Sequence, residues 1–451
     1  MVTAAREAPL DVAVSDGRIS AILAPGSDAA AERELDAAGC LVMPGGIDTH
    51  THARWPFDGK RTQDGFAGAG RSAAVGGTTT LVDFVPQLDP GQRLLDAAHD
   101  RIDEVEAESP VDVALHPILN RVDDQVLADI GEVIAAGLTS FKMYTTYSDK
   151  RVDDGQIWVL MQEIVRHRGL PGFHAENHDI IGIATERSAA LGHVALSDFP
   201  ETRPGIAEAA AIETVSLMAR KLNSAVYIFH VSGQEAFDAV LHGNQAPGGR
   251  VFAETCTHYL AFNDSVFSRD DAWKFVITPP IRGAADQDAL WRGIRDGQVT
   301  SVGSDHCAYP ASAKSEHPYD HRLVPPGAAG IEHRTPVLWD EAVNCRGLSP
   351  SQFVDISATR AARALGLYPQ KGTVAVGADA DLVVLDPEAA WTGADFPAAT
   401  FDTFSLYDDR KGKGRPKHVF SRGRQVVDSF AFTGRPGDGK FVARSRHPRL
   451  R

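Results

Sequence analysis

Six side chains with metal-binding or proton-transfer chemistry stand at the ends of short apolar runs in this chain. They are His50, His52, Lys142, His174, His230 and Asp305. Neutral imidazole and carboxylate groups are good ligands for zinc and similar divalent ions. A His-x-His pair on a strand also presents both imidazoles on one face, because side chains alternate with a period of two. The pattern predicts a binuclear metal site assembled from five separate strands.

Lys142 needs a separate explanation within this set. A free ammonium carries no lone pair and repels a cation. A lysine that has reacted with carbon dioxide carries an anionic carbamate, which is able to bridge two metal ions. The other interpretation is a lysine held in a salt bridge at its strand end, and the sequence by itself leaves both open.

The elements that must position these residues alternate between short strands and helices for more than 300 residues. Apolar residues at i, i+3 and i+4 predict helices between most of the strands, for example over 125–137 and 206–223. The predicted strands cover residues 40–43, 78–85, 111–118, 139–144, 172–175, 225–231, 250–256 and 300–305. Eight strands with helical crossovers predict an α/β fold of the (β/α)8 TIM-barrel type. A doubly wound open sheet is the alternative, but no glycine-rich dinucleotide turn follows the first strand.

Both ends of the chain lack this strand–helix alternation, and their sequences predict turns and short strands. Asp16-Gly17 is a hairpin signal near the N-terminus, and residues 372–427 again alternate strands with turns. We therefore predict a small β-sandwich domain built from both termini. Its two parts would be residues 1–46 and 373–451, and the barrel would occupy residues 47–372. The basic C-terminal tail, RSRHPRLR, is expected to fray.

Composition excludes several classes of function. The chain has 451 residues, with 43% hydrophobic and 23% charged residues, as expected for a globular protein. Its net charge of -15 argues against a nucleic-acid partner, which would need a basic face. Four widely spaced cysteines form no CxxC pair, and no apolar run approaches the ~20 residues of a membrane span. We expect a cytoplasmic protein with no membrane partner.

Motifs along nearly the full length resemble those of the amidohydrolase superfamily, and most closely those of its dihydropyrimidinase and hydantoinase branch of cyclic amidases. The residues of these motifs match those of the family, and so do the order and spacing of the motifs along the chain. The motifs are PGGIDTHTH (44–52), GGTTTLVDF (76–84), TSFKMYTTY (139–147), FHAEN (173–177), FHVS (229–232), ETCTHYL (254–260), TPPIR (278–282), GSDHC (303–307), a long stretch over 358–384, and SRGRQVV (421–427).

The resemblance implies a ligand set and a reaction. One metal ion would be held by His50, His52, Lys142 and Asp305, and a second by N6-carboxylated Lys142, His174 and His230. A hydroxide bridging the ions would attack an amide carbonyl of a cyclic substrate, with Asp305 moving the proton to the leaving nitrogen. Zinc is the expected metal, with manganese or iron as alternatives.

The resemblance also implies residues that contact the substrate, and the chain departs from the branch at two of these positions. Tyr147 matches the tyrosine that stabilises the oxyanion, and Thr278 matches a position whose backbone binds the substrate amide. Pro326 stands where the branch carries asparagine, and proline offers no N–H to the substrate. Arg54 gives a His-x-His-x-Arg spacing similar to dihydroorotases, in which the arginine captures a carboxylate; a surface arginine is the alternative.

These implications lead to one main function and two alternatives. The main prediction is a metal-dependent hydrolase that opens a cyclic ureide or imide, with hydantoin and dihydropyrimidine rings first. An allantoinase-like or dihydroorotase-like enzyme for a polar or anionic cyclic ureide is the second. A non-catalytic structural relative is the third, although such relatives have lost metal ligands and all six positions are present here. The resemblance further implies a homodimer or homotetramer.

Overall fold

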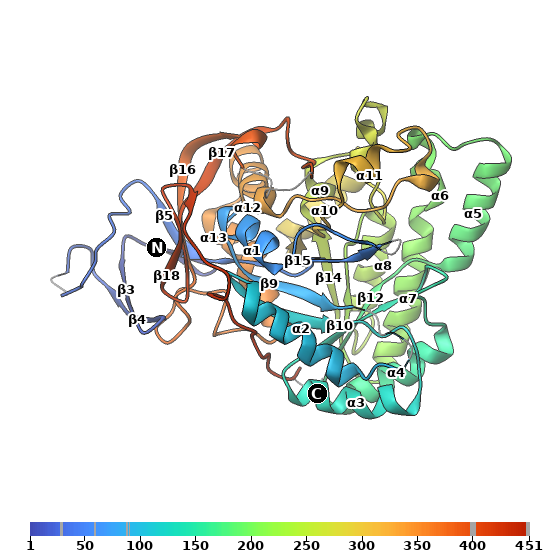
Figure 1. Cartoon of the computed structure of the whole chain (residues 1–451), viewed down its shortest axis with the longest axis horizontal. Coiled ribbons are helices and arrows are strands. Elements are labelled where there is room, and N and C mark those ends of the chain that lie inside the picture. Colours follow the sequence, from blue (N-terminus) through green and yellow to red (C-terminus); the bar gives the residue numbers. More distant parts are fainter. Residues whose placement is uncertain (28–29, 58–59, 87–88, 90, 397–402, 448–451) are drawn as a thin grey trace.

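The computed structural model describes residues 1–451 except 28–29, 58–59, 87–88, 90, 397–402 and 448–451. Figure 1 shows a barrel of strands and helices beside a smaller antiparallel sheet. Both the first and the last segments of the sequence contribute to the smaller sheet. The predicted α/β class, a TIM barrel with a β-sandwich from both termini, is confirmed.

Eight short parallel strands form the barrel, and nearly all of their residues are buried. Side chains on both faces must be covered in such a barrel, which explains the continuous apolar and β-branched runs in the sequence. The strands are β6 (Gly46–Asp48), β9 (Thr78–Val85), β10 (Asp112–Pro117), β11 (Ser140–Tyr144), β12 (Leu170–His174), β13 (Val226–Ile228), β14 (Val251–Cys256) and β15 (Val299–Gly303).

Two runs of paired strands are joined into the closed barrel by short bridges. One run has the order β10-β9-β6, and the other has the order β11-β12-β13-β14-β15. A parallel bridge between Ile118 and Lys142 joins β10 to β11. On the other side the bridge between Thr51 and His306 joins the segments that follow β6 and β15. Two predicted metal ligands, His52 and Asp305, therefore flank the residues that close the barrel.

Helices cover the outside of the barrel and bury one apolar stripe each. In α3 the buried residues Val126, Ile130, Val133 and Ile134 follow helical spacing, and Asp123 caps the first turn. The helices that follow the strands are α1 (Phe66–Val75), α2 (Leu94–Glu108), α3 (Asp124–Ala135), α4 (Asp154–Arg166), α5 (His178–Ala190), α6 (Phe199–Thr202), α7 (Gly205–Lys221), α8 (Gln234–Gln245), α9 (Thr257–Ala261), α10 (Ala284–Arg295), α11 (Ala311–Ser315), α12 (Arg334–Trp339), α13 (Pro350–Val354) and α14 (Arg360–Ala364).

The small domain is built around a five-stranded antiparallel sheet of order β19-β18-β17-β16-β5. The prediction that residues 40–43 form the first barrel strand is wrong. Residues 41–43 lie in β5, which pairs with β16 in this sheet, and the barrel begins only with β6. An apolar run does not specify its partner strand, and this one pairs with a strand about 340 residues later. The strands of the sheet are β5 (Leu41–Pro44), β16 (Leu382–Thr392), β17 (Lys411–Ser421), β18 (Arg424–Asp428) and β19 (Ala431–Phe432).

The N-terminal hairpin packs against this sheet. Strands β3 (Asp11–Ser15) and β4 (Arg18–Leu23) are joined by Asp16-Gly17, both with positive φ, as the two-residue turn requires. Two shorter pairs, β1 (Val2–Thr3) with β2 (Arg6–Glu7) and β7 (Pro56–Phe57) with β8 (Lys60–Arg61), complete the strands. Division of the chain at residues 46 and 372 stays a prediction.

The C-terminal segment runs beneath the barrel, so the prediction of a frayed tail is wrong for residues 444–447. The N–H groups of Val442 and Arg444 donate to the carbonyls of Val113 and Gly137, at 2.8 and 3.0 Å. The Arg444 side chain is buried and donates to Ser140 Oγ and to the Leu115 carbonyl. The last four residues, 448–451, lie outside the described part of the chain.

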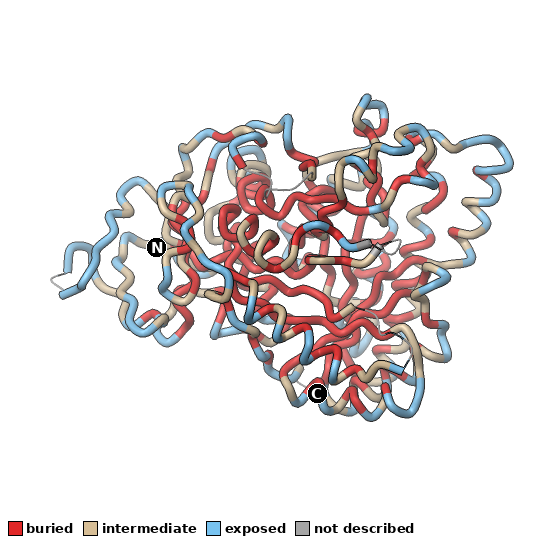
Figure 2. Tube along the Cα trace, in the orientation of Figure 1, coloured by how far each residue is buried: buried red, intermediate tan, exposed pale blue. Residues whose placement is uncertain are grey.

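Burial is concentrated in the barrel strands and the inner faces of the helices, as Figure 2 shows, while the N-terminal hairpin is largely exposed. Within the described residues, no helix combines the length and the apolar character needed to cross a membrane.

Candidate functional site

The six predicted ligand positions converge at the carboxyl ends of the barrel strands. Lys142 lies in β11 and His174 ends β12, while His230 and Asp305 follow β13 and β15 by two residues. His50 and His52 come directly after β6. The carboxyl ends of barrel strands form one rim, where (β/α)8 enzymes carry their active sites. The structure therefore brings together side chains that are separated by up to 255 positions in sequence.

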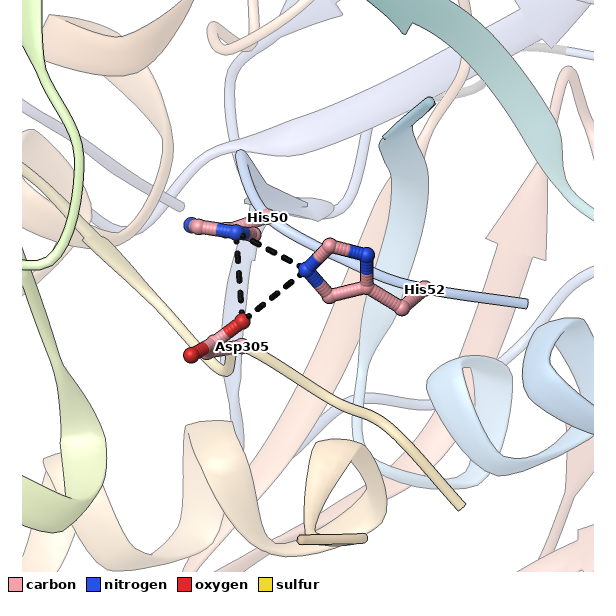
Figure 3. Close-up of side chains that lie close together, drawn as sticks. All are labelled: His50, His52 and Asp305. Atoms are coloured by element: carbon pink, nitrogen blue, oxygen red, sulfur yellow. Dashed lines mark hydrogen bonds and ion pairs between the residues drawn. The ribbon is translucent and has the colours of Figure 1, made fainter. Parts of the chain in front are cut away.

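One half of the cluster consists of two imidazoles and a carboxylate. His50 Nε2 and His52 Nε2 lie 3.1 Å apart, and Asp305 Oδ1 lies 3.1 and 3.2 Å from them (Figure 3). The three ligand atoms all lie within 4.8 Å of one another, which is compatible with a single ion between them. Lys142 Nζ is 2.9 Å from His50 Nε2 and so joins the same group.

The other half of the cluster is a second pair of imidazoles. His174 Nδ1 lies 2.8 Å from His230 Nε2. The rings of His50 and His230 stack at a centroid distance of 5.2 Å, so the two halves lie side by side. Lys142 lies over the rings of Phe84 and Phe229, at 4.5 and 4.6 Å from their centroids. Lys142 thus lies against both halves of the cluster.

The protonation of the imidazoles favours metal binding. Burial lowers the pKa of His174 to about 4 and that of His52 to about 3, and it lowers the pKa of His230 well below the ordinary value. All three are therefore neutral at pH 7, with a lone pair available. Burial opposes the ionisation of Asp305, but His50 and His52 outweigh it and hold the pKa of Asp305 well below its ordinary value.

Two glutamates, which the sequence prediction missed, orient ligand imidazoles. Glu254 Oε1 lies 2.7 Å from His50 Nδ1, and Glu176 Oε2 lies 2.6 Å from His174 Nε2. A carboxylate only accepts, so each ring donates to its glutamate and turns the lone pair of its other nitrogen toward the cluster. Glu176 was detectable in the sequence, because it follows His174 by two residues on the same side of the chain.

The donor set fits a pair of divalent ions. His50 Nε2 and His174 Nδ1 carry lone pairs, and each faces a ring nitrogen of another histidine at hydrogen-bond distance. Burial lowers the pKa of Lys142 to about 8, which favours the neutral amine that reacts with carbon dioxide.

A cavity of about 580 Å³ opens above the cluster, and its wall includes most of the predicted substrate-contacting residues. Tyr147, Thr278 and Pro326 line it, together with His52, Lys142, His174, His230 and Asp305. The Tyr147 hydroxyl lies 2.6 Å from Thr278 Oγ1, and burial raises the pKa of Tyr147 to about 12. The phenol therefore stays protonated and able to donate.

Arg54 lies elsewhere. Its guanidinium forms an ion pair with Glu108, with Nη2 at 2.6 and 2.7 Å from the two carboxylate oxygens. It is not among the residues that line the cavity. The His-x-His-x-Arg spacing gave no information about Glu108, which is 54 positions away. The structure thus gives Arg54 a partner within the chain in place of a substrate carboxylate.

Three residues of the site have backbone conformations that side chains rarely adopt. The φ angles of Tyr147, His230 and Asp305 are 70°, 42° and 50°. The left-handed region is unfavourable for residues other than glycine, and it recurs at functional sites because the surrounding structure holds it there. Each of these residues stands where a strand has just ended and the chain turns toward the cavity.

The chain matches known proteins over its whole length. The model of the amidohydrolase family matches residues 41–426. A D-hydantoinase of Ralstonia pickettii is 37% identical, with 99% of this chain and 98% of that protein covered, and a D-phenylhydantoinase of Escherichia coli O81 is 31% identical over 91% and 89%.

Solved structures give the same result. One D-hydantoinase, at 37% identity, superposes with a TM-score of 0.93 over 99% of this chain and 97% of its own. A dihydropyrimidinase from Brevibacillus agri, at 32% identity, gives 0.94 over 99% and 98%. By sequence and by structure, the chain belongs to the amidohydrolase family, in its hydantoinase and dihydropyrimidinase branch.

Proposed function

We propose that this protein is a metal-dependent cyclic amidohydrolase that opens a cyclic ureide or imide, such as a hydantoin or dihydropyrimidine ring, to an open-chain N-carbamoyl or amide acid. The observation that carries the proposal is the convergence of six ligand positions, five of which line one cavity while His50 contacts them from behind. Full-length relatives named D-hydantoinase and dihydropyrimidinase support the same reaction class.

The metal centre in this proposal contains two divalent ions, with zinc first and manganese or iron as alternatives. His50, His52 and Asp305 would hold one ion, His174 and His230 the other, and N6-carboxylated Lys142 would bridge them. Such ions supply a water molecule whose pKa is lowered toward ~7 and a positive charge near the reacting carbonyl. The neutral imidazoles and the buried amine support this assignment.

The remaining steps belong to the protein's own side chains. Asp305 accepts the proton of the attacking water and returns it to the ring nitrogen that leaves. The Tyr147 hydroxyl donates a hydrogen bond to the carbonyl oxygen as negative charge develops on it. The backbone around Thr278 binds the ring amide, and Pro326 lies in the same wall of the cavity without offering an N–H. The walls also exclude bulk water from the reacting bond.

Turnover of cyclic ureides and imides tests this function. Protein loaded with zinc or manganese should open at least one hydantoin, dihydropyrimidine or cyclic imide, and it should contain about two metal ions per chain, as a binuclear site requires. A non-catalytic structural relative would show a metal content near zero and no turnover. Asp305→Asn is the matched variant, because it keeps the side-chain shape and removes the proton acceptor.

A second candidate is an allantoinase-like or dihydroorotase-like hydrolase for an anionic cyclic ureide, and two cations in the cavity wall favour it. Lys150 and Arg61 both line the cavity. Lys150 Nζ lies 5.6 Å from the ring centroids of Trp55 and of Tyr147. Asp149 lines the same cavity, but Lys150 forms no ion pair with a carboxylate of the described residues. These cations, rather than Arg54, are placed to bind an acidic substituent.

Two substrates that differ only in the substituent decide between the candidates. If Lys150 binds a carboxylate, Lys150→Met should lower kcat/KM for a 5-carboxymethyl ring about ten-fold or more, since a charge-assisted hydrogen bond contributes over 1.4 kcal/mol. The value for the 5-carbamoylmethyl ring should change little. Lys221→Met, on the exposed face of α7, is the control. Equal losses on both rings would exclude anion binding by Lys150.

We also propose a cytoplasmic homo-oligomer, a dimer or a tetramer, on the strength of the family resemblance. The four cysteines are free, as expected in a reducing compartment. Light scattering on the purified protein measures the number of chains directly.

A further inference from the structure

Lys314, in the short helix α11, is a fully buried lysine that the proposed reaction does not use. Its relative exposure is 0%. Its Nζ donates to three backbone carbonyls, those of Gly327 at 2.5 Å, Val276 at 2.9 Å and Lys274 at 3.3 Å. No carboxylate in the described part of the chain lies within ion-pair distance of it. Among the described residues, Lys314 Nζ therefore donates hydrogen bonds only to uncharged backbone carbonyls.

A buried ammonium without a carboxylate is unfavourable, because burial favours the neutral amine. Burial accordingly lowers the pKa of Lys314 to about 7. The three carbonyl dipoles oppose this effect, since hydrogen bonds to the charged form stabilise it. Contact with the face of Phe404, 5.5 Å from Nζ, acts in the same direction. An apolar side chain would fill this space without the desolvation penalty, so the amine has a specific task at this position.

The three carbonyls belong to two segments that form one wall of the cavity. Ile277 and Thr278 line the cavity from the first segment, and Pro326 and Gly327 line it from the second. The segments contact each other directly where the Gly327 N–H donates to the Val276 carbonyl at 3.0 Å. Lys314 donates to that same carbonyl and to the carbonyl of Gly327, so it fastens the two segments together from behind.

The first of these segments also reaches the reacting groups. Thr278 Oγ1 lies 2.6 Å from the Tyr147 hydroxyl, the group proposed to donate to the substrate carbonyl. A shift of the segment by a fraction of an ångström would displace the backbone that faces the ring. Because Pro326 has no N–H, only the other backbone groups of the second segment are able to contact the ring, and their position therefore matters.

We propose that Lys314 is a positioning residue for the substrate, whose ε-amino group holds the 276–278 and 326–327 segments together and thereby fixes the shape of the wall against which the ring binds. The inference rests on the proposed function for the identity of the substrate, and on the hydrogen bonds for the position of the wall. Lys314 does not touch the substrate. Its loss should therefore weaken ring binding while leaving the metal centre and the proton-transfer groups in place.

Kinetics of Lys314→Met test this proposal. This variant keeps the chain length and removes all three donors, so KM for a turned-over ring should rise about ten-fold or more, with kcat within about three-fold of the parent protein. Metal content should stay unchanged. Lys314→Gln keeps an NH2 group that reaches one or two of the carbonyls. Its KM should therefore fall between that of the parent protein and that of Lys314→Met. Val240→Ala, in the buried face of α8, is the control for lost stability.

Amide hydrogen exchange gives a readout that does not require turnover. Exchange in peptides covering 274–278 and 325–328 should be faster in Lys314→Met than in the parent protein, and unchanged there in Val240→Ala. An unchanged KM together with unchanged exchange would overturn the proposal, and so would a KM increase equal to that of Val240→Ala. If the parent protein opened no cyclic ring, the proposed function would fail, whereas the exchange experiment would still decide the role of Lys314. Lys314→Gln provides the same comparison if Lys314→Met does not fold.

Discussion

At the scale of single residues, the site depends on groups whose chemistry is set by burial. His52 and His174 stay neutral because burial lowers the pKa of each imidazole. Tyr147 stays protonated for the same reason, because burial raises its pKa to about 12. A phenol with a raised pKa is a poor nucleophile and a reliable hydrogen-bond donor, so its proposed role is to bind the developing oxyanion.

Tyr147→Phe should reduce kcat by about 10²- to 10³-fold, the usual effect of removing one oxyanion donor. KM should change much less, because the hydroxyl interacts most strongly in the transition state. Steady-state kinetics with metal analysis on the same sample provide the measurement. The exposed Tyr368 supplies a control substitution, Tyr368→Phe. Retention of at least a third of the parent kcat by Tyr147→Phe would rule out the oxyanion role.

At the scale of elements, the barrel strands place the ligands and the C-terminal segment closes the barrel from the other end. Each ligand stands in a strand or within four residues of its end, and three site residues turn there with positive φ. Beneath the strands, Arg444 fills the opposite end of the barrel and donates to Ser140 and Leu115. The carboxyl ends of the barrel strands thus hold the reactive groups, whereas the contacts at the opposite end of the barrel stabilise the fold.

Arg444→Ala should therefore lower stability without affecting the reaction. The substitution removes a buried side chain and leaves the Leu115 carbonyl without this donor, which together should cost about 2–4 kcal/mol of unfolding free energy. The expected result is a lower Tm with kcat/KM unchanged at a temperature where the variant is folded. Arg446→Ala is the matched control, because Arg446 is two residues further along and exposed. Equal Tm values for the two variants would contradict this assignment.

At the scale of the whole molecule, a buried ion cluster connects the barrel to the small sheet. Lys371 Nζ lies 2.5 Å from Asp112 in β10, and 2.6 and 3.0 Å from Asp381 and Asp379, which precede β16. Burial alone would lower the pKa of Lys371, but the three carboxylates outweigh it and raise that pKa. The cluster therefore fixes how the two β structures sit against each other.

Lys371→Met should destabilise the protein by about 3–5 kcal/mol, because it removes the cation that three buried carboxylates share and leaves Asp381 without an ion-pair partner among the described residues. Since the pKa of Lys371 is raised in the folded protein, its contribution is fully present below the unfolded value of about 10.4 and is lost only as the pH rises through the folded value. Chemical denaturation of the parent and the variant from pH 7 to 10 should therefore give a constant difference. Asp381→Asn in the Lys371→Met background should recover part of the loss, because Asp381 has no second ion-pair partner among the described residues. A difference that decreases steadily between pH 7 and 9 would contradict the assignment.

Much of the fold and most of the site could be predicted because the relevant signals are local. Short apolar and β-branched runs identified seven barrel strands, and helical spacing identified helices such as α3 and α7. Strand ends gave the six ligand positions, since the carboxyl ends of barrel strands must share one rim. Asp16-Gly17 gave its hairpin because only a few residue types accept two successive positive φ angles.

The tertiary structure alone decided which distant groups became partners. It paired residues 41–44 with β16 rather than with the barrel, Arg54 with Glu108, and the C-terminal segment with the underside of the barrel. It also placed Glu254 behind His50 and Lys314 behind the cavity wall. A local pattern determines what a residue is able to do and on which face it stands. The partner of a charge or of a strand edge depends on which remote groups the folded chain brings within about 3 Å, the reach of a hydrogen bond.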